Sequence, residues 1–196
     1  ILFKETSRGD KALDILNKST AKYPNNAESH AIISDILRSK GKLEAARSSI
    51  EKAININPDI ADYHYNLGLI FIGLRIFSKA IISLKQAILL NPNLIEAHLN
   101  LFSVHMDLSE LSEAELSVKN AIKIDPNSSI AHFNLSRIYI ELGKDSQAEL
   151  SVKKAIEIHP SFPQAYNTLG IILMSLNKLL EAEVSTRKAI ELKDDY

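Results

Sequence analysis

The 196-residue chain contains no cysteine and no tryptophan. Without cysteine, disulfides, thiolate zinc sites and thiol catalysis are excluded. Acidic and basic side chains nearly balance, at 24 and 23, so no strong positive field is available to bind nucleic acid or to anchor the chain to a membrane. No apolar run approaches the ~20 residues that cross a bilayer. We therefore expect neither nucleic-acid binding nor membrane insertion.

Motifs for catalysis are also missing. The sequence has no Gly-x-Ser-x-Gly, no phosphate-cradling glycine loop and no His-Glu-x-x-His. We predict that the chain is not an enzyme and holds no cofactor. The N-terminus has neither an initiator methionine nor the pattern of a signal peptide. We accordingly expect a piece of a longer protein with a cytoplasmic location.

Prolines are few, and five of the six stand in strict register. They are Pro24, Pro58, Pro92, Pro126 and Pro160, which follow one another at intervals of 34 residues. A fixed period of this length is typical of stacked helix pairs. If each repeat begins three residues after its proline, residues 1–26 form the end of a truncated repeat. The full repeats are then 27–60, 61–94, 95–128, 129–162 and 163–196.

The register aligns apolar and small residues into two helical stripes. Positions 4, 7, 8 and 11 share one face of a first helix, and positions 20, 24 and 27 share one face of a second. Position 20 is alanine in every repeat, and position 8 is small except at Phe102. Small residues let the two helices approach closely. Gly41 and Gly143 mark the end of the first helix, and the prolines end the second.

These columns resemble the tetratricopeptide repeat (TPR) family over the whole chain. The family pattern has Leu-Gly at positions 7 and 8, alanine at 20 and 27, and proline at 32. Its large aromatic at position 4 is replaced here by His30, His64, His98, His132 and Tyr166. The resemblance implies an all-α fold, a single α-solenoid over residues 1–196. In it, antiparallel helix pairs form a right-handed superhelix whose first helices line a concave groove.

Two charged or titratable columns allow both a functional and a structural interpretation. The four histidines at position 4 could form a metal ladder. The axes of adjacent first helices should be roughly 10 Å apart, however, which is too far for two histidines to bind one metal ion at metal–nitrogen distances of ~2 Å. We predict packing histidines and no metal site. The basic column Lys85, Lys119, Lys153 and Arg187 could bind a polyanion. Glutamates four residues before the last three favour paired surface charges instead.

Position 6 carries Asn66, Asn100 and Asn134 in three consecutive repeats, although asparagine is a mediocre helix former. An amide donates and accepts at once, which suits a peptide backbone. The column is similar to the asparagine ladder in the TPR superhelix of O-linked N-acetylglucosamine transferase, and it stops at Ile32 and Thr168. The alternative is that these amides bond within the solenoid. The other predicted groove residues are Tyr65, Leu69, Leu99, Ser103, Phe133, Arg137 and Asn167.

The function that these features favour is a protein–protein interaction scaffold. It would bind an extended peptide or a partner helix in the concave groove. The alternative is the substrate-recognition TPR region of a larger enzyme, such as a glycosyltransferase or a sulfotransferase. Self-association through the end repeats is a third possibility. A chaperone-tail clamp is not expected, because Glu28, Asp62 and Glu96 stand where that TPR subclass has basic residues.

Overall fold

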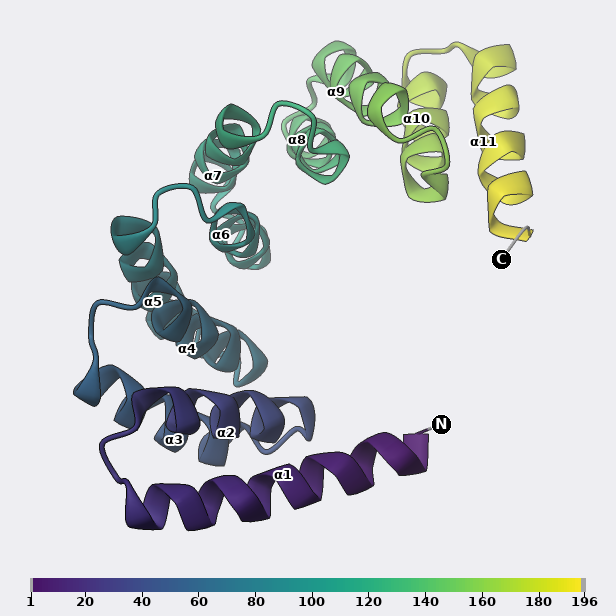
Figure 1. Cartoon of the computed structure of the whole chain (residues 1–196). Coiled ribbons are helices and arrows are strands. Elements are labelled where there is room, and N and C mark those ends of the chain that lie inside the picture. The colour runs from purple at the N-terminus through teal and green to yellow at the C-terminus, as the bar shows by residue number, and fades with distance from the viewer. Residues whose placement is uncertain (1, 195–196) are drawn as a thin grey trace. The chain divides into compact units, whose positions relative to one another are not determined.

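The computed structural model describes residues 2–194, and within them every regular element is an α-helix (Figure 1). The eleven helices of this described part are α1 (Leu2–Lys22), α2 (Ala27–Ser39), α3 (Leu43–Ile56), α4 (Ala61–Gly73), α5 (Phe77–Leu90), α6 (Ile95–Asp107), α7 (Leu111–Ile124), α8 (Ser129–Glu141), α9 (Asp145–Ile158), α10 (Pro163–Ser175) and α11 (Leu179–Asp194). The all-α prediction is confirmed.

The helix boundaries follow the 34-residue period. In each full repeat the first helix begins at the first residue of the repeat, as at Ala27, and the second begins sixteen residues later, as at Leu43. The second helix ends just before the Asn-Pro, Asp-Pro or His-Pro pair, because the residue before proline is driven out of helical geometry. The predicted pairing of two helices per repeat is thus confirmed.

The N-terminal segment differs from the predicted truncated repeat. α1 runs without a break through Ser7, which holds the turn position of that repeat. It still ends in register, because Lys22 lies one period before Ile56, the last residue of α3. The helix that ends at Lys22 therefore extends past the turn position toward the N-terminus.

The chain divides into two compact units, residues 1–100 and 101–196. In the first unit α1 packs on α2, α2 on α3, α3 on α4 and α4 on α5. In the second unit α7 packs on α8, α8 on α9, α9 on α10 and α10 on α11. Within each unit these consecutive helices thus pack on one another, as expected for stacked helix pairs. The boundary falls inside α6, and the single solenoid over residues 1–196 stays a prediction.

The core of each unit is built from the small and branched residues of the two stripes. Ala46, Ala53 and Ile50 are fully buried in α3, and Ala114 and Val118 are fully buried in α7. Alanines at positions 20 and 27 present only a methyl group, so the two helices can approach closely. Burial of the intervening aliphatic residue then supplies the stabilising apolar area.

All five turns between paired helices use the same backbone conformation. The turn residue has a positive φ in each case: 71° at Gly41, 58° at Arg75, 59° at Ser109, 64° at Gly143 and 58° at Asn177. Only glycine adopts this left-handed region without steric cost. Glycine indicates the turns at Gly41 and Gly143 in the sequence. The other three turns are predicted only by their spacing of 34 residues from these two.

We expect Ser109→Gly to stabilise the second unit by about 1 kcal/mol, because it relieves the left-handed strain at a non-glycine residue. The exposed Ser109 side chain leaves little packing to lose. Gly143→Ala is the matched control, since it introduces the same strain one repeat later at a site with no atom within 4 Å of an added Cβ. Urea denaturation followed by circular dichroism measures both. A destabilised Ser109→Gly variant would contradict the prediction.

The predicted pairing of the acidic and basic columns on the second helices is confirmed. Lys119 binds Glu115 at 2.7 Å, and Arg187 binds Glu183 at 2.8 Å. Glu149 is only 9% exposed and accepts from Lys153 at 2.5 Å and from Lys178 of the next turn at 2.8 Å. The bonds from Lys153 and Lys178 lower the pKa of Glu149 against the opposing effect of its burial. This carboxylate joins one repeat to the next.

Candidate functional site

The histidine column has a structural role. The ring Nε2 of each histidine at position 4 donates to the carbonyl oxygen of the proline six residues earlier. The four pairs are His30–Pro24 at 2.9 Å, His64–Pro58 at 2.7 Å, His98–Pro92 at 3.3 Å and His132–Pro126 at 3.0 Å. A carbonyl only accepts, so the bond requires the Nε2–H tautomer when the ring is neutral. Each histidine thereby ties the proline turn to the first helix that follows it.

The proline carbonyl occupies Nε2 of each of these histidines, which leaves Nδ1 as the ring nitrogen with a lone pair. Burial lowers the pKa of His98, and the Pro92 carbonyl bond only partly opposes this. Within residues 2–194 there is no cluster of three or more histidine or carboxylate side chains placed to hold a metal ion. In the same range, none of the helices combines the length and the apolar character needed to cross a lipid bilayer.

In the first unit, the predicted groove residues lie on α4 and α6. Tyr65, Asn66, Leu69, Leu99 and Asn100 are all half-buried. The Asn100 amide Nδ2 donates to the Tyr65 hydroxyl at 3.2 Å and to the Glu96 carbonyl at 2.8 Å. Burial raises the pKa of Tyr65, so the phenol keeps its proton at neutral pH. Both amide hydrogens of Asn100 are thus used, and its Oδ1 oxygen is the group that can accept from a ligand.

In the second unit, the predicted groove residues are less alike. Asn134 is only 8% exposed, whereas Ser103, Arg137 and Asn167 are exposed and Phe133 is half-buried. Arg137 lies over the Phe102 ring, 5.7 Å from its centroid. Phe133 packs against Phe162 with ring centroids 5.0 Å apart. We call the five predicted groove residues of each unit the first-helix face of that unit.

The three asparagines therefore do not form a row of equivalent amides. Asn66 is half-buried, Asn100 donates within its own unit, and Asn134 is buried. For Asn100, the alternative interpretation is confirmed, because its amide group donates hydrogen bonds only to other groups of the same unit that are given above, Tyr65 and Glu96. Sequence reasoning missed the bond between Tyr65 and Asn100, although their spacing of one period plus one residue places them on adjacent first helices. A peptide-binding role for the column stays a prediction.

Comparison with family models gives matches in three parts of the chain. Residues 35–74 match the model described as TPR repeat. Residues 118–149 match one described as tetratricopeptide repeat, and so do residues 61–94 and 163–196 in a further model. Together the matches cover well over half of the chain, and those at 61–94 and 163–196 have the same bounds as two of the predicted repeats.

Known proteins with similar sequence or structure include one curated protein and two solved structures. Superkiller complex protein 3 of Mus musculus is 33% identical over 66 residues, which cover 34% of this chain and only 4% of the mouse protein. The crystal structure of MamA is 26% identical with a TM-score of 0.77, covering 83% of this chain and 95% of MamA. YrrB, described as a TPR protein with an unusual peptide-binding site, is 18% identical with a TM-score of 0.74, covering 92% and 93% of the two chains.

Proposed function

The chain is a tetratricopeptide repeat protein, and from this premise we propose that it is a non-catalytic interaction module that binds a protein partner through its first-helix face. TPR domains generally act by binding other proteins, and YrrB is described as having a peptide-binding site. The ligand class that we propose is an extended peptide. A partner helix is the competing ligand, and it would need an apolar stripe in place of backbone hydrogen bonds.

The observation that carries the proposal is the bond between Asn100 and Tyr65. It sets an amide oxygen beside a phenol hydroxyl on two adjacent first helices. The Asn100 oxygen can accept from a peptide N–H, and the Tyr65 hydroxyl, which accepts from Asn100, keeps its own hydrogen to donate to a peptide carbonyl. An extended backbone presents such donors and acceptors in alternation. The pair can therefore hydrogen-bond to the main chain of a peptide whatever its side chains are.

Around this pair, apolar side chains offer contact area. Leu69 lies four residues after Tyr65 on α4, Leu99 directly precedes Asn100 on α6, and both are half-buried. In the second unit Phe133 supplies an aromatic surface, and the exposed Arg137 and Asn167 supply polar groups. Polar groups that fix the backbone, beside apolar surface that contacts side chains, are the usual composition of a peptide-binding surface.

We expect the triple variant Tyr65→Phe, Asn66→Ala, Asn100→Ala to lose at least about tenfold in affinity for peptides selected from a random library by the wild-type protein, since each hydrogen bond contributes about 1 kcal/mol. Fluorescence anisotropy with labelled peptides measures the loss. Leu116→Ala with Leu150→Ala is the control, because both leucines are exposed on second helices. Unchanged affinity in a folded triple variant would contradict the proposal.

A further inference from the structure

The asparagine of α8 is buried without a partner. Asn134 is 8% exposed, and within residues 2–194 its amide takes part in no hydrogen bond. Its amide nitrogen and oxygen are not sealed from solvent, so a ligand can still reach them. Asn100, one repeat earlier, differs because it donates to Tyr65 and to the Glu96 carbonyl. A buried amide without a partner lowers stability, and a ligand that bonds to it removes that cost.

A cation without an acidic partner lies on the same face of α8. Arg137 follows Asn134 by three residues, so the two side chains are neighbours on the helix surface. The guanidinium of Arg137 lies over the ring of Phe102, 5.7 Å from its centroid, and this contact orients it. Within the described residues 2–194 it forms no ion pair, and Glu141 four residues later does not bind it. Since Arg137 is exposed, it can pair with an anion from outside the protein.

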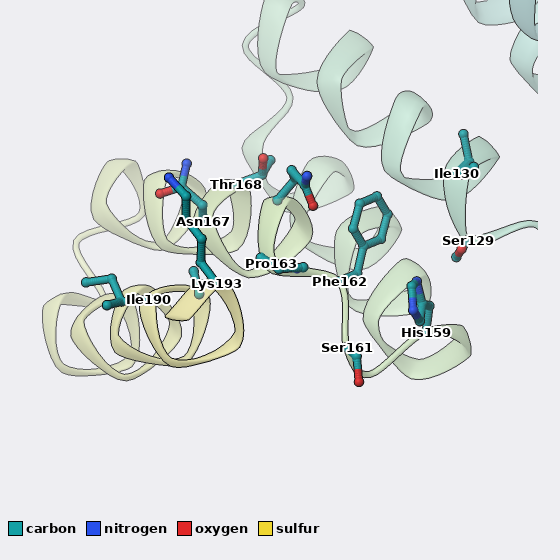
Figure 2. Close-up of a pocket in the computed structure, with 12 residues that line it drawn as sticks. Ser129, Ile130, His159, Ser161, Phe162, Pro163, Asn167, Thr168, Ile190 and Lys193 are labelled. Carbon is teal, nitrogen blue, oxygen red and sulfur yellow. The ribbon is translucent and has the colours of Figure 1, made fainter. Parts of the chain in front are cut away.

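Aromatic packing holds the part of α8 that carries this pair. Phe133, which directly precedes Asn134, packs on Phe162 with ring centroids 5.0 Å apart. Figure 2 shows Phe162 on the segment that leads into α10 and Ile130 on the first turn of α8. The contact between the two rings therefore joins α8 to the start of α10. Side chains on a helix that is fixed in this way are pre-organised, so less order has to be gained when a ligand binds.

The charges beside this pair select an anion. Positions 2, 5, 6, 9 and 12 of a repeat lie along one side of the first helix, and on α8 and α10 they carry a single charged residue, Arg137. On α2 and α4 the same positions carry Glu28, Asp35 and Asp62 beside one base, Arg38, whose guanidinium lies 3.6 Å from Asp35. An acidic ligand is thus favoured only by the second unit. One guanidinium balances one carboxylate, whereas a phosphate would bring a charge of about −1.5 to −2.

We infer that Asn134 and Arg137 bind an aspartate or a glutamate of the peptide in the second unit. The amide of Asn134 bonds to the main-chain N–H and carbonyl of that residue, and Arg137 pairs with its carboxylate. Side chains three residues apart on a helix have Cβ atoms about 5–6 Å apart, a separation that one acidic residue can span. The inference rests on the proposed peptide-binding function and names the residue type that the second unit prefers.

The test uses the full chain and pools of short peptides, each pool with one fixed central residue. The fixed residue is aspartate, asparagine or phosphoserine. The flanking positions are random but uncharged, and a fluorescent label and an amide block the two ends. Fluorescence anisotropy at low and at high salt gives the apparent affinity of each pool. We expect the aspartate pool to bind about fivefold tighter than the asparagine pool, and salt to reduce this difference.

Three variants localise the effect. Arg137→Gln is expected to abolish the preference for aspartate. Arg38→Gln in the first unit is the matched control and should leave the preference unchanged, because Asp35 already lies beside that guanidinium. Asn134→Leu should weaken binding of both the aspartate and the asparagine pool by about threefold or more. It should also raise the urea midpoint of unfolding, because it removes a buried amide that has no partner.

Equal binding of the aspartate and asparagine pools, or a preference that survives Arg137→Gln, would overturn the inference and leave the proposed function intact. So would tightest binding of the phosphoserine pool, which would indicate recognition of a phosphopeptide. A lower urea midpoint for Asn134→Leu would show that this amide serves the fold, and would overturn its assigned role. If neither these pools nor any library peptide binds, both proposals are wrong.

Discussion

Replacing Phe102 by alanine is expected to lower the stability of the second unit by about 3–5 kcal/mol, the largest loss that we predict for a single side chain. Phe102 stands at position 8, where Ser34, Gly68, Ser136 and Gly170 are small. The repeat pattern alone would therefore suggest that a small residue is tolerated there. The structure shows the opposite, because the ring is only 1% exposed.

The ring of Phe102 holds together residues from three helices. It belongs to one buried cluster with Ala114 and Val118 of α7 and with Ile138 of α8. Truncation to alanine would leave a cavity among fully buried neighbours that belong to well-packed helices, and such cavities collapse only partly. The guanidinium of Arg137 would also lose the ring over which it lies.

The measurement is urea denaturation followed by circular dichroism, because the chain has no tryptophan to report by fluorescence. Native-state hydrogen exchange locates the loss, since repeat proteins can unfold in parts. Met174→Ala is the control, because Met174 lies on a first helix but is 61% exposed. A loss below about 1 kcal/mol for Phe102→Ala would contradict the packing described here.

The second large effect is expected at Gly68, where adding one methyl group should destabilise the first unit. A Cβ at Gly68 would lie 2.8 Å from both Cγ and Cδ2 of Leu84, which is fully buried. Gly→Ala in a helix normally stabilises by about 1 kcal/mol. Overpacking of a buried branched side chain costs about 1–3 kcal/mol. We therefore expect a net loss of up to about 2 kcal/mol for Gly68→Ala.

Another repeat of the same chain supplies the compensating change. Ser136 and Val152 occupy the positions of Gly68 and Leu84 two repeats later, and both are fully buried. The double variant Gly68→Ser with Leu84→Val reproduces that pair. It should recover stability relative to the sum of the single variants by about 1 kcal/mol or more. Additive losses in the double-mutant cycle would show that Leu84 is not the residue that excludes a side chain at Gly68.

Much of this fold could be predicted from the prolines and alanines. Pro58 and its equivalents end the second helices through a local effect on the preceding residue, so these helix ends follow from the sequence. Ala46 and its equivalents mark the face on which the two helices of a repeat pack closely. The continuous α1 could not be predicted in this way. The period places a turn at Ser7 as it does at Ser109, yet the helix continues through Ser7, and the residue type does not distinguish the two positions.

The site was less predictable for a related reason. The column Asn66, Asn100 and Asn134 appears uniform in sequence, yet Asn66 and Asn100 are half-buried whereas Asn134 is buried. The Tyr65–Asn100 bond joins two repeats, and its existence depends on the residue that each repeat places opposite the other. Repeat periodicity specifies positions on a helix, whereas contacts between repeats depend on the side chains that differ from one repeat to the next.

The most direct test of the central claim is an NMR titration of the side-chain amides with a peptide selected from a random library. We predict chemical-shift changes at Asn66, Asn100 and Asn167 on the first helices. The amides of Asn120 and Gln147 on second helices should stay unchanged. Changes centred on Asn120 and Gln147, with Asn66 and Asn100 unaffected by saturating peptide, would contradict the assignment of binding to the first-helix face.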